Sequence, residues 1–134
     1  MQRRVGWSDI GPARHVNNAV YLSYIDDCGM QVAAAFGWPA GRMLAEGFGI
    51  IARRHRLEYR QSALLDDPLE IATWVSHVKR ATAFRHYVIT RLSDGALVAR
   101  ARTLYVWVNI HTGQPLRIPS RFLADFGPNI CNST

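Results

Sequence analysis

The segment from residue 9 to residue 18 concentrates side chains that can act on a carbonyl group: Asp9, His15, Asn17 and Asn18. A carboxylate can serve as a general base or a nucleophile, and a histidine can orient a carboxylate or a water molecule. Paired asparagines are typical of a helix start, where free N–H groups can polarise a carbonyl and stabilise an oxyanion. The same residues also have structural interpretations, in which Asp9 caps the loop onto the helix and the asparagines cap the helix.

Basic residues form two further clusters. Lys79-Arg80-Ala81-Thr82 lies in a turn between predicted strands, and Arg53, Arg54 and Arg56 lie along one strand. Lysine offers phosphate a point charge and arginine a planar fork. The formal net charge of +6 also favours anionic partners, such as nucleic acid, a phosphorylated cofactor or an acidic carrier protein. An ordinary charged turn and a solvated strand face are the alternative interpretations of these clusters.

Length and composition predict one domain over residues 1–134. With 49% hydrophobic residues the chain can bury a core, and 19% charged residues are too few for a disordered tail. No apolar run reaches the roughly 18 residues that span a bilayer, and no signal peptide is evident, so we expect the cytosol. Cys28 and Cys131 predict free thiols, because their spacing suits neither a disulfide framework nor a metal site.

Hydrophobic periodicity and turn residues predict the elements that position these side chains. Gly11-Pro12 ends an N-terminal strand, Gly37 ends a long helix, and Ser93-Asp94-Gly95 is a hairpin turn. One long helix with an antiparallel meander indicates a two-layer α+β domain. The helix covers one face of the sheet and leaves open edges, which favours pairing with another copy. The expected helices are Ala19–Phe36 and Pro119–Phe126, and the expected strands are Met1–Ser8, Gly49–Ser62, Leu69–Val78, Ala83–Leu92 and Ala96–Asn109.

The segment from Val5 to Leu22 resembles the signature of hotdog-fold acyl-CoA thioesterases of the 4-hydroxybenzoyl-CoA thioesterase type. That signature runs Trp-x-Asp-x-Asp, a three-residue loop, His-Val-Asn-Asn-Ala and then Tyr-Leu. The stretch from Tyr59 to Ile71 and the strands around Asp94-Gly95 match the family in layout, so the resemblance covers nearly the whole chain. It implies the hotdog fold, an antiparallel sheet wrapped around one long central helix. It also implies a homodimer with joined sheets or a homotetramer.

The resemblance further implies hydrolysis of an acyl thioester, carried by coenzyme A or by an acyl carrier protein, without a metal or redox cofactor. Asp9, His15, Asn17 and Asn18 would form the catalytic site, and backbone N–H groups at the helix start would polarise the carbonyl. A related branch of hotdog thioesterases uses a helix carboxylate, which makes Asp26 or Asp27 a fallback catalyst.

Substrate contacts are also implied. Tyr21 matches the family tyrosine one turn into the helix, with core packing as its alternative role. Lys79, Arg80 and Thr82 occupy the turn that is often basic, with a hydroxyl, near the phosphates of coenzyme A. Trp7 and Trp38 flank the predicted site and could border an acyl pocket.

The sequence departs from the family at Gly11, which stands where the second aspartate of Asp-x-Asp is commonly the catalytic carboxylate. Glycine can be neither a base nor a nucleophile. Asp9 can serve instead, because positions two apart in an extended segment point the same way. Alternatively, other polar groups near the helix start activate water, or the protein binds thioesters without hydrolysing them.

Other function classes fit the sequence less well. A hydratase of the same fold carries four residues between its aspartate and histidine, whereas five separate Asp9 from His15. A nucleic-acid binder would suit the net charge of +6, but the chain has no RNP motif, zinc spacing or helix-turn-helix pattern. We therefore expect no nucleic-acid partner.

Overall fold

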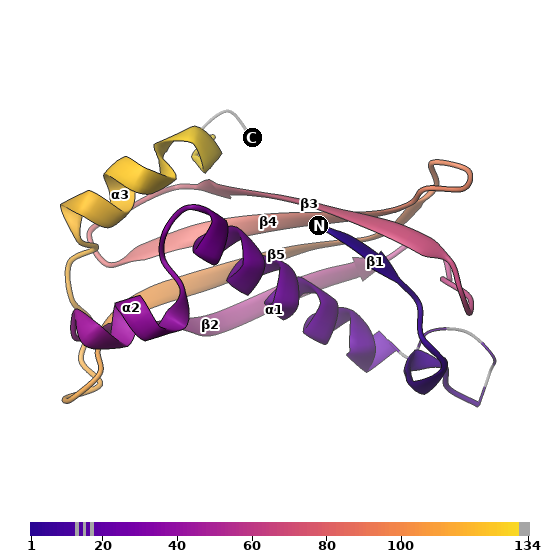
Figure 1. The fold of residues 1–134 in the computed structure, drawn as a ribbon, viewed down its shortest axis with the longest axis horizontal. Coiled ribbons are helices and arrows are strands. Elements are labelled where there is room, and N and C mark those ends of the chain that lie inside the picture. Colours follow the sequence, from indigo (N-terminus) through magenta and orange to yellow (C-terminus); the bar gives the residue numbers. More distant parts are fainter. Residues whose placement is uncertain (13, 15, 17, 132–134) are drawn as a thin grey trace.

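The structure is a computed structural model that describes residues 1–12, 14, 16 and 18–131. A five-stranded antiparallel sheet in the order β1-β3-β4-β5-β2 forms its main layer, and α1 lies across one face of that sheet (Figure 1). The strands are β1 (Gln2–Arg4), β2 (Phe48–Tyr59), β3 (Pro68–Ser76), β4 (Thr82–Arg91) and β5 (Leu97–Asn109). The helices are α1 (Asn18–Ala35), α2 (Ala40–Ala45) and α3 (Ser120–Phe126), with short 3-10 turns η1 (Trp7–Asp9) and η2 (Gly127–Asn129).

The predicted long helix is confirmed as α1. Its buried residues Tyr21, Tyr24, Ile25 and Cys28 follow helical spacing and form one apolar stripe against the sheet. Gly37 follows the helix with φ of +91°, the left-handed conformation that glycine adopts most readily after a helix. The α+β architecture predicted from the sequence is therefore present.

One local prediction was wrong, and one short helix was not predicted. The expected strand Met1–Ser8 is a strand only at Gln2–Arg4, and Trp7–Asp9 is a 3-10 turn in which the Asp9 N–H donates to the Gly6 carbonyl at 3.0 Å. A tight turn here replaces extended backbone because the Asp9 side chain also binds the Gly6 N–H. The sequence also gave no indication of α2, which begins directly after Pro39.

Buried side chains divide into two apolar cores. The first core lies between the N-terminal part of α1 and the sheet, and includes Tyr21, Tyr24, Ile25, Leu69, Ile71, Tyr87 and Ile89. The second core lies where α1 ends and α3 packs on the sheet, and includes Trp38, Phe48, Val75, Trp107, Ile118, Phe122 and Phe126. Half-buried Val32 packs against both cores.

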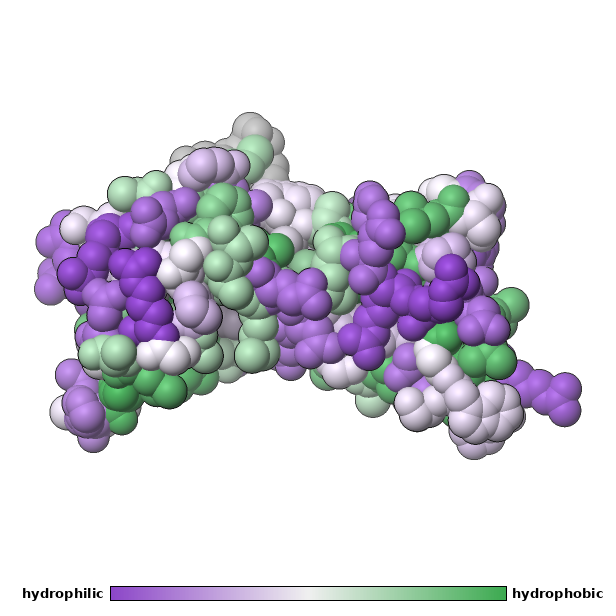
Figure 2. Space-filling view, in the orientation of Figure 1, coloured by the Kyte–Doolittle hydropathy of each residue, from purple (hydrophilic) through white to green (hydrophobic). Residues whose placement is uncertain are grey.

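The surface around the second core is partly hydrophobic and partly hydrophilic. On the face drawn in Figure 2, the surface over α2 is hydrophobic and the surface over the start of α3 is hydrophilic. Met30 of α1 and Leu44 of α2 are 65% and 57% exposed. Within the described part of the chain, no helix has the length and apolar character needed to cross a bilayer.

Candidate active site

Asp9 joins the loop before α1 to the helix itself. Its Oδ2 accepts hydrogen bonds from the Gly6 N–H at 3.0 Å and from the Tyr24 hydroxyl at 2.6 Å. Tyr24 is buried, and burial followed by the hydrogen bond to Asp9 raises its pKa, so the phenol keeps its proton as a donor. These contacts give Asp9 the capping role, while its catalytic role stays a prediction.

The fallback carboxylates differ in their surroundings. Asp27 Oδ2 accepts a hydrogen bond from Arg3 Nη1 at 2.6 Å, and the same guanidinium lies 4.5 Å from the centre of the Tyr24 ring. Asp27 is therefore ion-paired, one of the two ordinary roles, solvated or ion-paired, of a helix carboxylate. Asp26 is exposed and lines the cavity described below.

Of the remaining predicted catalytic residues, Asn18 lies within the described part of the chain. Asn18 is exposed and is the first helical residue, and its carbonyl accepts a hydrogen bond from the Tyr59 hydroxyl at 3.1 Å. Val16 is buried and forms an isolated antiparallel bridge with Ile10. His15 and Asn17 lie outside the described residues, so their proposed roles remain predictions. Gly11 accepts a hydrogen bond from the Arg14 N–H at 3.0 Å.

The surroundings of Tyr21 match its alternative role, which is packing in the core. It is 1% exposed, and its hydroxyl accepts a hydrogen bond from the Ala63 N–H at 3.2 Å. Its ring packs against Tyr24 and Tyr59, with centroid distances of 5.9 and 5.6 Å. Tyr21 thus holds the beginning of α1 against the segment between β2 and β3.

We expect Tyr24→Phe to lower the free energy of unfolding by about 1.5–3 kcal/mol, the usual range for a hydrogen bond to a charged group. The change removes the donor to half-buried Asp9 without altering the ring. Tyr59→Phe is the matched control, because its exposed hydroxyl donates to an uncharged acceptor, the Asn18 carbonyl, and its loss should cost less. Urea denaturation of both variants measures the difference, and equal losses would show that the Tyr24–Asp9 contact does not anchor the loop.

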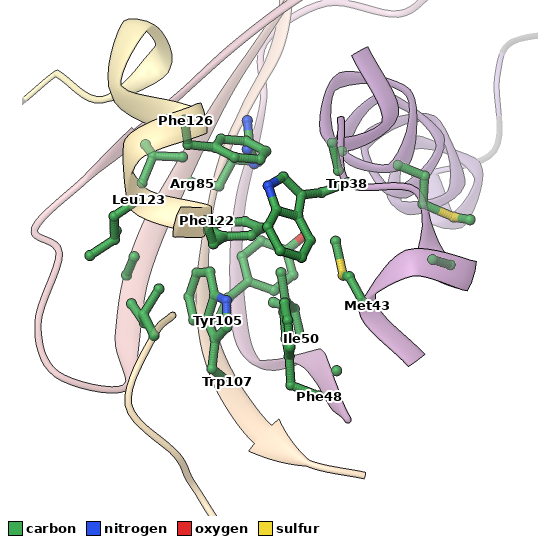
Figure 3. Close-up of a pocket in the computed structure, with 18 of the residues that line it drawn as sticks. Trp38, Met43, Phe48, Ile50, Arg85, Tyr105, Trp107, Phe122, Leu123 and Phe126 are labelled. Carbon is green, nitrogen blue, oxygen red and sulfur yellow. The ribbon is translucent and has the colours of Figure 1, made fainter. Parts of the chain in front are cut away.

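A large apolar cavity lies at the other end of α1. Its volume is about 630 Å³, within the range of roughly 300–1,000 Å³ typical of small-molecule sites. The walls come from α1, α2 and α3 and from strands β2, β3, β4 and β5 (Figure 3). Trp38 lines this cavity, as suggested from its position in the sequence, whereas Trp7 is 79% exposed and is not among the lining residues. Aromatic side chains form much of the wall: Trp38, Phe48, Tyr105, Trp107, Phe122 and Phe126.

A basic hollow adjoins the cavity. Lys79, Arg80 and Arg117 line it, with a volume of about 430 Å³. It shares wall residues Val78, Ile118 and Leu123 with the apolar cavity. The turn is closed by a hydrogen bond from the Lys79 N–H to the Thr82 carbonyl at 2.8 Å, and the Ile118 N–H donates to the Arg80 carbonyl at 2.8 Å.

Arg117 was missed by the sequence analysis because it stands alone in the segment between β5 and α3, with no motif or spacing around it. Contact with Arg80 through the Ile118 backbone brings this segment to the predicted basic turn. Thr82, predicted alongside Lys79 and Arg80, supplies the carbonyl that closes the turn and does not line the hollow.

The predicted site residues form two separate groups in one protomer. Asp9 and Asn18 lie where α1 begins, whereas the β3–β4 turn lies at the end of the sheet near α3 (Figure 1). The 18 residues of α1 correspond to a length of about 27 Å. The structure therefore places Asp9 and Asn18 at one end of α1 and Lys79 and Arg80 near the other, and does not join the two groups in one protomer.

Fold and sequence together identify the class of protein. Residues 5–126 match the thioesterase-like superfamily, and the chain belongs to that family. The family match confirms the resemblance given by the segment from Val5 to Leu22 and the expectation of a thioester hydrolase. A 1,4-dihydroxy-2-naphthoyl-CoA thioesterase from Synechocystis has the same fold, with a TM-score of 0.88 at 16% identity, covering 95% of this chain and 93% of that one. The hotdog fold is thereby confirmed.

Curated relatives include two proteins of Escherichia coli. The chain is 27% identical to the long-chain acyl-CoA thioesterase FadM of strain K12 over 108 residues, which cover 78% of this chain and 79% of that protein. It is 23% identical to the acyl-CoA thioester hydrolase YbgC of strain O6:H1 over 124 residues, covering 92% and 91% of the two proteins.

Proposed function

We propose that this protein hydrolyses an acyl-CoA, with water and the thioester giving a carboxylate, a proton and the free thiol of coenzyme A. The observation that carries the proposal is the contact between the apolar cavity and the basic hollow, which share Val78, Ile118 and Leu123. An acyl-CoA combines an apolar acyl group with a phosphorylated carrier. The acyl group matches the apolar cavity, and the phosphates match the basic hollow. The names of FadM and YbgC support the same substrate class.

Residue roles follow from this proposal. The N–H groups at the start of α1 would stabilise the oxyanion that forms when water attacks the carbonyl. Asp9, with His15, Asn17 and Asn18, would activate and hold that water. Removing one oxyanion donor in other enzymes costs about 10²–10³ in rate, so the helix start is expected to contribute strongly.

Substrate binding would use the other end of the molecule. Lys79, Arg80 and Arg117 would pair with the coenzyme A phosphates, with Thr82 fixing the turn. Tyr21 would act as a positioning residue, because its hydroxyl is already bound to the Ala63 N–H. An acidic acyl carrier protein would meet the same basic hollow and is the alternative carrier.

A homodimer would complete the site. β2 is an edge strand and its residues 51–56 are exposed, so its backbone is available for pairing with a second sheet. If two β2 strands pair in antiparallel orientation, the sheets of the two copies point in opposite directions along that strand. The start of α1 in one copy would then lie at the end that carries the cavity and basic hollow of the other. We propose one such catalytic unit over residues 1–134 of each copy, with a homotetramer as a further assembly.

Thiol release from short, medium, long and aromatic acyl-CoAs tests the proposal. We expect the wild type to release thiol from at least one of them and Asp9→Ala to lower kcat by about 10²-fold or more, within the contribution of general base catalysis. Activity that survives Asp9→Ala in a folded variant would assign water activation to other groups at the helix start.

Gly11 supports a second function, in which the protein binds acyl thioesters without hydrolysing them. In this case the wild type would bind acyl-CoA but release no thiol, and Gly11→Asp would gain activity. Hydrolysis by the wild type at a rate above the uncatalysed reaction would rule out this second function.

A further inference from the structure

Arg85 is a buried cation in the wall of the apolar cavity. It lies on the helix-facing side of β4, is 7% exposed, and lines the cavity together with Trp38, Phe122 and Phe126 (Figure 3). Its guanidinium carbon is 5.6 Å from the centre of the Phe126 ring. The side chain therefore places a positive charge among aromatic rings.

The partners of Arg85 carry no charge. Its Nη1 donates to Thr73 Oγ1 and to Asn129 Oδ1, both at 3.0 Å. Asn129 is itself fixed by a hydrogen bond from its Nδ2 to the Thr73 carbonyl at 2.9 Å. No ion pair joins Arg85 to a carboxylate of the described residues, and Asp26, which also lines the cavity, is exposed.

A buried charge without a counter-charge is costly. Burial lowers the pKa of Arg85 from its ordinary value, yet arginine retains its proton in proteins. The positive charge is therefore permanent, and a negative group entering the cavity would gain a strong, charge-assisted hydrogen bond.

A second polar residue in the wall of the cavity is Trp107. Trp107 is 4% exposed, and its indole Nε1 is buried without a hydrogen-bond partner within the described part of the chain. Trp107 lies on β5, which pairs directly with β4. An apolar cavity whose wall holds a cation without a counter-charge fits an apolar ligand with a negatively charged acceptor group.

We propose that the cavity binds acyl groups whose far end carries a carboxylate, and that Arg85 pairs with that carboxylate. This inference rests on the proposed hydrolysis of acyl-CoA and names its substrate class: ω-carboxyacyl thioesters. The apolar wall would hold the chain, Arg85 would select the terminal charge, and the thioester would remain outside toward the basic hollow. Arg85 is thus a specificity residue rather than a catalytic one.

Hydrolysis of two chain-matched substrates tests the proposal. The wild type is expected to show a KM at least tenfold lower for the monothioester decanedioyl-CoA than for decanoyl-CoA. Arg85→Met should abolish this preference and Arg85→Lys should retain part of it. Arg102→Met is the control, because exposed Arg102 lies on the neighbouring strand outside the cavity and should leave the preference intact. Equal KM values in the wild type, or a preference that survives Arg85→Met, would overturn the proposal.

Binding without hydrolysis separates this inference from the proposed function. Trp38 and Trp107 line the cavity, so tryptophan fluorescence can report titration with decanoate and with decanol. Decanoate should bind the wild type at least tenfold more tightly than decanol, and the two should bind Arg85→Met equally. Equal binding to the wild type would overturn the role of Arg85 even if no thioester is hydrolysed. Arg85-dependent binding of decanoate without a preference for decanedioyl-CoA would assign the site to free acids and overturn the substrate class.

Unfolding in urea confirms that the variants are comparable. Burying a charge without a counter-charge costs free energy, and an apolar side chain of similar size removes that cost. Arg85→Met is therefore expected to keep the urea midpoint of the wild type or raise it, and Arg85→Lys provides a second folded variant that retains the charge.

Discussion

Trp38→Ala is expected to lower the free energy of unfolding by about 3–5 kcal/mol, the usual range for removing a buried aromatic side chain. Trp38 is 0% exposed, and its ring contacts Phe48 and Phe122 at centroid distances of 5.5 and 5.4 Å. Its Nε1 donates to Asp125 at 2.8 Å, and the Arg42 guanidinium lies 3.7 Å from its ring centre. The indole therefore ties the end of α1 to α2, β2 and α3.

The cavity beside Trp38 increases the expected loss of stability. The side chains around Trp38 already border an empty space, so few atoms are available to fill the gap that the indole leaves. Trp7→Ala is the matched control, since Trp7 is 79% exposed and should change stability by less than about 0.5 kcal/mol. Urea denaturation followed by circular dichroism measures both variants. A loss below about 1 kcal/mol for Trp38→Ala would show that the second core does not contribute substantially to the folded state.

Combined replacement Lys79→Glu and Arg117→Glu is expected to raise the KM for acyl-CoA by about 100-fold or more. Each residue would lose a hydrogen bond to a charged phosphate worth about 1.5–3 kcal/mol, and about 1.4 kcal/mol corresponds to a factor of ten. The kcat should stay within about threefold, because these side chains would hold the coenzyme A phosphates rather than the reacting carbonyl and would contribute uniform binding. Steady-state kinetics on one acyl-CoA measures both parameters.

The matched control is Arg4→Glu combined with Arg102→Glu, which changes the net charge by the same amount at exposed positions away from the hollow. An equal rise of KM in this control would attribute the effect to the overall field of the protein. An unchanged KM in the Lys79→Glu and Arg117→Glu variant would place the phosphates elsewhere.

Local signals in the sequence predicted most of the fold. The spacing of Tyr21, Tyr24, Ile25 and Cys28 and the stop at Gly37 define α1 within a few residues, since both depend on neighbours along the chain. Residues 7–9 were predicted wrongly because weak alternation does not reveal that a side chain will cap its own turn. For α2, a short helix after Pro39 depends on packing against the second core.

The candidate site could likewise be predicted only where its residues are close together in the sequence. Lys79 and Arg80 form a local cluster, so the basic turn could be recognised from sequence. Arg85 could not, because its burial depends on strand register, which places it opposite Val75 and Thr103, and on Asn129 from η2. The cavity is likewise formed by segments far apart in the chain, whose contacts exist only in the folded protein.

The two cores support different parts of the molecule. The first core holds the start of α1, and the second surrounds the cavity, with half-buried Val32 packed against both. Substitutions at distant, independent sites usually have additive effects on stability. Changes at Phe122 or Phe126 in α3 should therefore alter the cavity while the loop around Asp9 keeps its geometry. If the proposed function holds, substrate selectivity and catalysis would depend on different cores and could change nearly independently in evolution.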